Sequence, residues 1–146
     1  MEIKSANYFG VLSRLELEDF EKTNEIVLPS DYREFLLEFN GGVPNPNRNM
    51  QRDTRVSYIF GMHNGEYYAS LYKHVDMFKN RLPLSTFPIA SDFFGNLFIM
   101  SVHPEGLGHI YFWAHEEEPA VQDGNYTDNC YFVAYSFSEF LNELVP

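Results

Sequence analysis

The chain has 146 residues, of which 45% are hydrophobic and 17% aromatic, and its net charge is −11. This length suits one domain, spanning residues 1–146, and the composition excludes a disordered chain. The single cysteine, Cys130, excludes a scaffold of internal disulfides. No run approaches the roughly 20 apolar residues that span a bilayer, and the N-terminus lacks the apolar core of a signal peptide. We therefore expect a cytoplasmic protein that does not act in a membrane.

The charge is distributed unevenly along the chain. Residues 1–81 hold 12 acidic and 10 basic side chains, whereas residues 82–146 hold 9 acidic ones and neither Lys nor Arg. Phosphate binding needs Lys and Arg, so nucleic acid and anionic membrane surfaces are excluded as partners. A basic protein is the partner that this charge favours, although an acidic surface that only keeps the protein soluble explains the same pattern.

Two helices are expected in the N-terminal part. Residues 15–23 have partial helical periodicity, and LPSDYREFLLEFNGG, residues 28–42, predicts a second, better defined helix. Pro29 suits the first turn, and Ser30 and Asp31 can accept hydrogen bonds from its unpaired amides. The apolar stripe is formed by Tyr32, Phe35, Leu36 and Phe39. Asn40-Gly41-Gly42 ends the helix, because glycine adopts a left-handed conformation without strain. Nothing in this stretch is reactive, so it predicts a structural element.

The remaining elements are mostly strands. A long polar loop is expected at 43–53, a strand at 54–61 and a third helix at 68–80. Further strands are expected at 87–92, 96–102, 109–115 and 130–136, with a hairpin turn at 92–96 and an acidic loop at 116–129. A capping box, Ser136 with Glu139, then begins a C-terminal helix. This order predicts an α+β fold: an antiparallel, mostly β-sheet packed by N-terminal helices, a middle helix and a C-terminal helix.

No constellation of residues predicts catalysis. His103, His109 and His115 are spaced six residues apart, and two of them on one straight strand would be about 20 Å apart, too far to bind one zinc ion. Cys130 has no neighbouring base. We therefore expect neither an enzyme nor a metal or other cofactor. The alternative, a small hydrolase or metal-binding enzyme, would use His115 and the adjacent glutamates.

The strand at 109–115 has two bulky faces. Tyr111 and Trp113 lie on one face together with His109 and His115, and Ile110, Phe112 and Ala114 lie on the other. Either the strand is central and covered on both faces, or one aromatic face is presented to a partner. Burial is the more general fate of large aromatic side chains, whereas Tyr and Trp are also frequent anchors of interfaces.

Three segments together resemble the SUKH superfamily, the Smi/Knr-like proteins. They are LPSDYREFLLEFNGG, FPIASDFFGNLFIMSV and GHIYFWAHEEE, which lie between residues 28 and 118 in the order of the family. The positions that match the family pattern, and that we interpret mainly as determinants of the fold, are Leu28, Pro29, Tyr32, Phe35, Asn40, Gly41, Gly42, Asp92, Gly95, Asn96, Tyr111, Trp113 and His115.

The resemblance implies a protein-binding function. Many bacterial members are immunity proteins that neutralise toxins, often nucleases, and eukaryotic members act as regulatory or scaffold domains. The resemblance together with the acidic C-terminal half predicts an immunity protein that occludes a basic toxin, with a regulatory or scaffold module as the alternative. The side chains that we expect to contact the partner are His115, Glu116, Glu117, Glu118, Asp123 and Asp128.

Overall fold

The computed structural model describes residues 1–120 and 125–146, and it confirms the α+β fold. The α-helices of this part of the chain are α1 (Arg14–Asn24), α2 (Ser30–Phe39), α3 (Leu71–Phe78) and α4 (Phe137–Asn142). The strands are β1 (Glu2–Lys4), β2 (Val43–Asn45), β3 (Arg48–Asn49), β4 (Thr54–Ile59), β5 (Thr86–Asp92), β6 (Leu97–Ser101), β7 (Ile110–Trp113) and β8 (Cys130–Ala134). None of these helices is long and apolar enough to cross a membrane.

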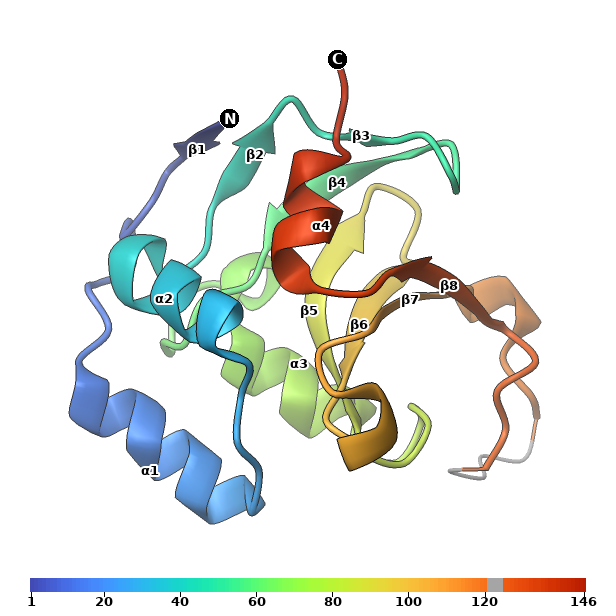
Figure 1. The fold of residues 1–146 in the computed structure, drawn as a ribbon, viewed down its shortest axis with the longest axis horizontal. Coiled ribbons are helices and arrows are strands. Elements are labelled where there is room, and N and C mark those ends of the chain that lie inside the picture. Colours follow the sequence, from blue (N-terminus) through green and yellow to red (C-terminus); the bar gives the residue numbers. More distant parts are fainter. Residues whose placement is uncertain (121–124) are drawn as a thin grey trace.

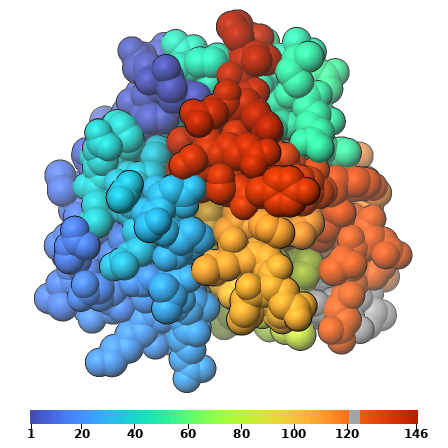
Figure 2. Space-filling model, in the orientation of Figure 1, coloured from blue at the N-terminus to red at the C-terminus, as the bar shows by residue number. Residues whose placement is uncertain are grey.

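The main sheet is an antiparallel meander in the order β3-β4-β5-β6-β7-β8. Helix α4 packs on one face, where the rings of Phe98 and Phe140 are 5.0 Å apart, and Figure 2 shows the C-terminal segment covering this side. Helix α3 packs on the other face, where Phe78 meets Trp113 at 5.6 Å (Figure 1). Adjacent residues of a strand point to opposite faces, so β7 buries Phe112 under one layer and Trp113 under the other.

The end of α2 explains the Asn-Gly-Gly sequence. Asn40 has the left-handed conformation, and its side chain donates to the carbonyls of Gly10 and Met62 and accepts from the amide of Met62. A Cβ atom on Gly41 would be only 2.7 Å from the backbone of Gly61. Asn40 thus joins three segments, and glycine is required next to it because two backbones cross there.

The N-terminal half contains strands that the sequence did not predict. The expected loop at 43–53 holds β2, which pairs with β1, and β3, which pairs with β4. The prediction of one long polar loop was therefore wrong at residues 43–45 and 48–49, which form strands. These strands are two or three residues long, and their partners, not their own side-chain pattern, determine that they form.

Several element ends also differ from the prediction. Pro29 precedes α2 as its N-cap, without a capping side chain, and Asp31 accepts from the amide of Tyr32. The expected helix at 68–80 is a short 3-10 helix, η1 (Tyr67–Ala69), followed by α3, because the Ser70 hydroxyl caps α3 by accepting from the Lys73 amide.

The capping box of α4 is only half formed. The Ser136 hydroxyl accepts from the amide of Glu139, as expected. The carboxylate of Glu139, however, accepts from the amide of Tyr135 and not from that of Ser136. The helix still begins where the sequence predicts, since the hydroxyl bond satisfies an amide of its first turn.

Candidate protein-binding surface

Asp92 organises the turn between β5 and β6. One carboxylate oxygen accepts from the amides of Phe94 and Asn96, each at 2.9 Å. The other accepts from the side-chain amide of Asn96 at 2.9 Å and from the hydroxyl of Thr54 at 3.0 Å. Asn96 in turn accepts from the backbone amide of His115 at 3.0 Å. Asp92 and Asn96, two of the positions that carry the resemblance, therefore link β4, the β5–β6 turn and the end of β7.

Gly95 and His115 complete this network. Gly95 has a φ of +87°, and a Cβ atom there would be 3.2 Å from Nε2 of His115. The imidazole thus packs against the turn, in a place that only glycine leaves open. His115 does not end a strand as predicted, because β7 ends at Trp113 and His115 begins the 3-10 helix η3 (His115–Glu117). Among the described residues, no three His, Cys, Asp or Glu side chains converge on a possible metal site.

The other matching positions are mostly in the core. Leu28, Tyr32 and Phe35 are 2%, 0% and 5% exposed, and Trp113 is 1% exposed. Burial raises the pKa of the Tyr32 hydroxyl well above its ordinary value. Pro29 packs against Gly108 in the turn before β7. Tyr32 and Phe35 pack α2 against Phe137 of α4, whereas Trp113 packs against α3 on the other face of the sheet, so these positions define the fold.

The acidic segment after β7 is partly used inside the molecule. Glu118 accepts two hydrogen bonds from Arg81, both at 2.9 Å, and the hydrogen bond to Glu118 is the main reason why the pKa of Arg81 is raised. The guanidinium of Arg81 lies 4.3 Å from the ring centre of Phe78. This ion pair fixes η3 to the end of α3, so Glu118 has a structural function in addition to its charge.

Glu117 also has a partner within the chain. Its carboxylate accepts from the hydroxyl of Tyr131, whose ring lies 4.1 Å below the guanidinium of Arg52. Glu116 and Asp128 are exposed to solvent. Asp123, the remaining acid of the predicted set, lies outside the described residues. The structure therefore places Glu116 and Glu117 on η3 and Glu118 directly after it, next to β8.

An aromatic cluster lies on β7 and β8, the two strands that this acidic segment connects, and on the residues directly before β7 and after β8. We define the aromatic cluster as His109, Tyr111, Phe132 and Tyr135. The rings of Phe132 and Tyr135 are 4.7 Å apart, and these two side chains are 36% and 65% exposed. Both interpretations of strand 109–115 are thus partly correct: Trp113 is covered by α3, whereas Tyr111, on the same face, belongs to the partly exposed aromatic cluster.

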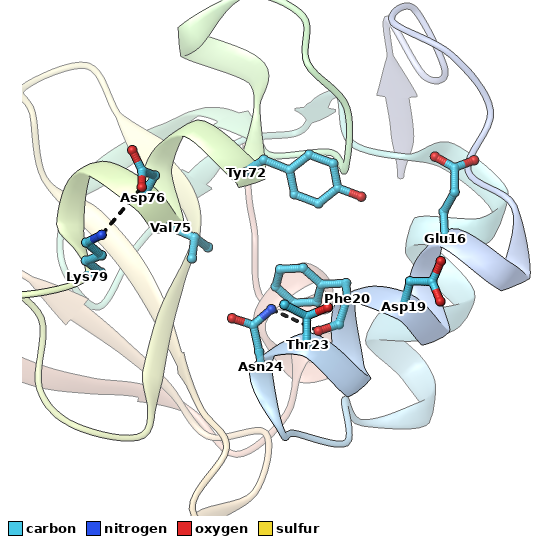
Figure 3. A pocket seen from close by; sticks show the side chains of 9 residues that line it. All are labelled: Glu16, Asp19, Phe20, Thr23, Asn24, Tyr72, Val75, Asp76 and Lys79. Carbon is cyan, nitrogen blue, oxygen red and sulfur yellow. Dashed lines mark hydrogen bonds and ion pairs between the residues drawn. The ribbon is translucent and has the colours of Figure 1, made fainter.

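A groove between α1 and α3 was not predicted from the sequence. Its volume is about 580 Å³, and Phe20, Tyr72 and Val75 form its apolar part (Figure 3). Acidic side chains from both helices stand at its edge, namely Glu16, Asp19 and Asp76. A signal existed in the sequence, because acids flank the apolar positions of both predicted helices, but the sequence does not show that the two helices are neighbours.

The groove continues toward the aromatic cluster. A second hollow of about 240 Å³ shares Phe20 and Val75 with the groove. A third hollow of about 370 Å³ shares Pro83 and Thr86 with the second and reaches Tyr111. A series of adjoining hollows therefore runs from the groove, past the end of α3, to the exposed face of β7.

The fold and these surfaces define a class of protein: an acidic α+β module whose exposed features are apolar hollows and aromatic side chains bordered by carboxylates. Residues 12–143 match the model of the SMI1/KNR4 family (SUKH-1), and the chain belongs to this family. It is also similar to YokK, an SPbeta prophage-derived uncharacterized protein of Bacillus subtilis (strain 168), with 26% identity over 164 residues. That alignment covers 98% of this chain and 80% of the relative. No solved structure matches the chain.

Proposed function

We propose that this protein is an immunity protein that binds a basic, nuclease-type toxin and neutralises it by occlusion, one copy for each toxin molecule. The observation that carries the proposal is the exposed aromatic cluster at the strands β7 and β8, which the acidic segment of η3 connects. Membership of the SMI1/KNR4 family supports it, because many bacterial SUKH proteins are immunity proteins.

The chemistry of the two features is complementary. A nuclease must present basic side chains to the phosphates of its substrate, and the same side chains are attracted by carboxylates. Such charges increase the rate of encounter more than the final affinity. Exposed aromatic side chains provide large contact areas with little loss of conformational entropy, so they supply the lasting contacts. Occlusion of the substrate-binding surface then stops the toxin without any catalytic step.

The first experiment tests occlusion. The protein is co-expressed with the product of the adjacent gene, the complex is purified, and nuclease activity is titrated against added protein. Activity should reach its minimum at one copy per toxin. Protection at a much lower ratio would instead indicate an enzyme, and a stable complex with a host protein that is not a toxin would favour the regulatory module. His115→Ala should leave the neutralisation endpoint unchanged, whereas loss of protection by a folded variant would favour the hydrolase alternative.

The second experiment tests the acidic segment. Glu116 and Asp128 are changed together to Lys, and the association rate is measured against salt concentration. Glu118 is left intact because of its ion pair with Arg81. The control is the same charge change at Glu34 and Glu38, which are exposed on α2.

If the acidic segment attracts the toxin electrostatically, the Glu116/Asp128 variant should associate several-fold more slowly at low salt. Its association rate should also depend less on salt, and its thermal stability should be almost unchanged. The association rate of the Glu34/Glu38 control variant should fall much less. Equal rates for the two variants would mean that only net charge matters and that the segment near η3 has no special role.

A further inference from the structure

The groove between α1 and α3 combines an apolar floor with an acidic edge. The ring of Phe20 lies 6.0 Å from that of Tyr72, in a stacked arrangement, and Val75 continues the floor along α3 (Figure 3). Phe20 is 9% exposed, while Tyr72 and Val75 are partly buried. Only part of this apolar surface is therefore covered by the protein itself, and a ligand that covers the rest would gain hydrophobic stabilisation.

The groove is also in a negative field. Glu16 and Asp19 project from α1, and Asp76 projects from α3 on the other side. The pKa of Tyr72 is raised, first by burial and then by the charges of Glu16 and Asp19, so their field reaches the floor. The single basic residue of the groove, Lys79, lies 3.8 Å from Asp76. An occupant that complements this surface has apolar side chains flanked by Lys or Arg.

The walls determine which backbone conformation can bind. Both walls are helices, whose backbone amides and carbonyls are already paired within the helix. An extended segment would find no sheet edge here and would leave its own backbone groups unpaired. A helical segment satisfies its backbone internally and needs only side-chain contacts. The shorter wall, α3, has 8 residues and is about 12 Å long, which corresponds to roughly two turns of a bound helix.

We propose that the groove binds a basic amphipathic helix of the partner, with its apolar side chains over Phe20, Tyr72 and Val75 and its Lys or Arg side chains toward Asp19 and Asp76. This inference deepens the proposed function and rests on it in assigning the helix to the toxin. The adjoining hollows support one continuous interface, because they connect the groove with the aromatic cluster around Tyr111.

Two substitutions test the groove. Val75→Lys places a charge over the floor, and Asp19→Lys reverses a charge at the edge. The matched control is Glu18→Lys, which makes the same charge change on an exposed residue of α1 that does not line the groove. Glu16 is not used, because it forms the capping box of α1 with Ser13. Thermal unfolding of each variant confirms that it is folded.

The first probe is a fluorescent 14-residue peptide with a stripe of Leu at helical spacing and Lys at the other positions, measured by fluorescence anisotropy. Its two controls are a scrambled peptide of the same composition and a peptide with Glu in place of Lys. The first peptide should bind the wild type at least tenfold more tightly than either control. Val75→Lys and Asp19→Lys should each weaken its binding at least fivefold, and Glu18→Lys less than twofold. Equal binding by all three variants, or no binding by the wild type, would overturn the proposal.

The second arm uses the purified toxin and separates this inference from the proposed function. If the wild type binds and neutralises the toxin but Val75→Lys, Asp19→Lys and Glu18→Lys all do so equally well, the proposed function stands and the groove is not part of the interface. If the wild type does not neutralise the toxin, the proposed function fails, and the peptide measurements alone decide whether the groove binds a basic helix. A loss of toxin affinity of at least tenfold, confined to the two groove variants, would confirm both.

Discussion

Substitution of Asp92 tests whether the family positions determine the fold or contact the partner. Asp92 is 5% exposed, and its carboxylate accepts four hydrogen bonds. A hydrogen bond to a charged group contributes about 1.5–3 kcal/mol. The amides of Phe94 and Asn96 lie in a turn that water can reach, so water replaces part of what Asp92→Ala removes. The hydroxyl of Thr54, which is buried, is left without its acceptor. We expect Asp92→Ala to lower the free energy of unfolding by about 3–4 kcal/mol.

Asp92→Asn provides a finer test of the same contacts. The amide keeps one oxygen for the two backbone amides, but its NH₂ group faces the NH₂ group of Asn96, and two donors cannot pair. The expected loss is about 1–2 kcal/mol. The control is Asp53→Ala: this carboxylate pairs with Arg48 at 2.7 Å, but its side chain is 77% exposed, so we expect a loss below about 1 kcal/mol.

The free energies are measured by urea unfolding, followed by the fluorescence of the buried Trp113. Toxin affinity is measured for each variant under conditions in which it is fully folded. We expect the affinity to be unchanged. If Asp92→Ala is as stable as the Asp53→Ala control and yet binds the toxin poorly, the turn is a contact surface and our structural interpretation of the family motif is wrong.

Three further predictions concern the core, the acidic segment and buried histidine. Phe35→Ala should lower the free energy of unfolding by about 3–5 kcal/mol in a urea titration, because it leaves a cavity beneath α2, and toxin binding should weaken only where the fold is lost. In thermal unfolding, Glu118→Gln should cost about 1 kcal/mol through its ion pair with Arg81, which is partly exposed, whereas Glu116→Gln should cost less than about 0.5 kcal/mol; the reverse order would contradict the assignment. Burial lowers the pKa of His74 below its ordinary value of 6.5, so the unfolded chain takes up the proton first and stability should fall as the pH drops below about 6.5. His74→Gln should flatten that fall in unfolding experiments from pH 7 to 5, and an unchanged slope would refute it.

The helix stop at residues 40–42 could be predicted from the sequence because its cause is local. A left-handed residue followed by two glycines ends a helix whatever surrounds it. The short strands β1, β2 and β3 could not be predicted in this way. Each forms only because the rest of the fold brings a partner strand beside it: Ile3, for example, pairs with Pro44, more than forty positions further along the chain.

The candidate surface shows the same limit. The sequence locates the charges of Glu116, Glu117 and Glu118 in one segment. It does not show that Glu118 binds Arg81, which is 37 positions away, or that Glu117 binds Tyr131 across the start of β8. The groove could not be predicted from the sequence, because it depends on how α1 and α3 pack together. The periodicity of a helix shows which of its faces is apolar but not which helix lies beside it.

The separation between fold-defining and exposed residues explains why family membership identifies the fold but not the partner. Asp92, Asn40 and Gly95 make contacts that any chain with this turn and this crossing of backbones requires. Glu116 and Asp19 are exposed, and no backbone contact described above depends on them. A change at such a position costs little stability, usually within about 0.5 kcal/mol. Exposed acids can therefore be replaced while the fold is preserved, and one scaffold can be fitted to partners with different charge patterns. We therefore expect the acidic side chains of this protein to match its own partner, and the substitutions at η3 and in the groove test that expectation at exposed positions.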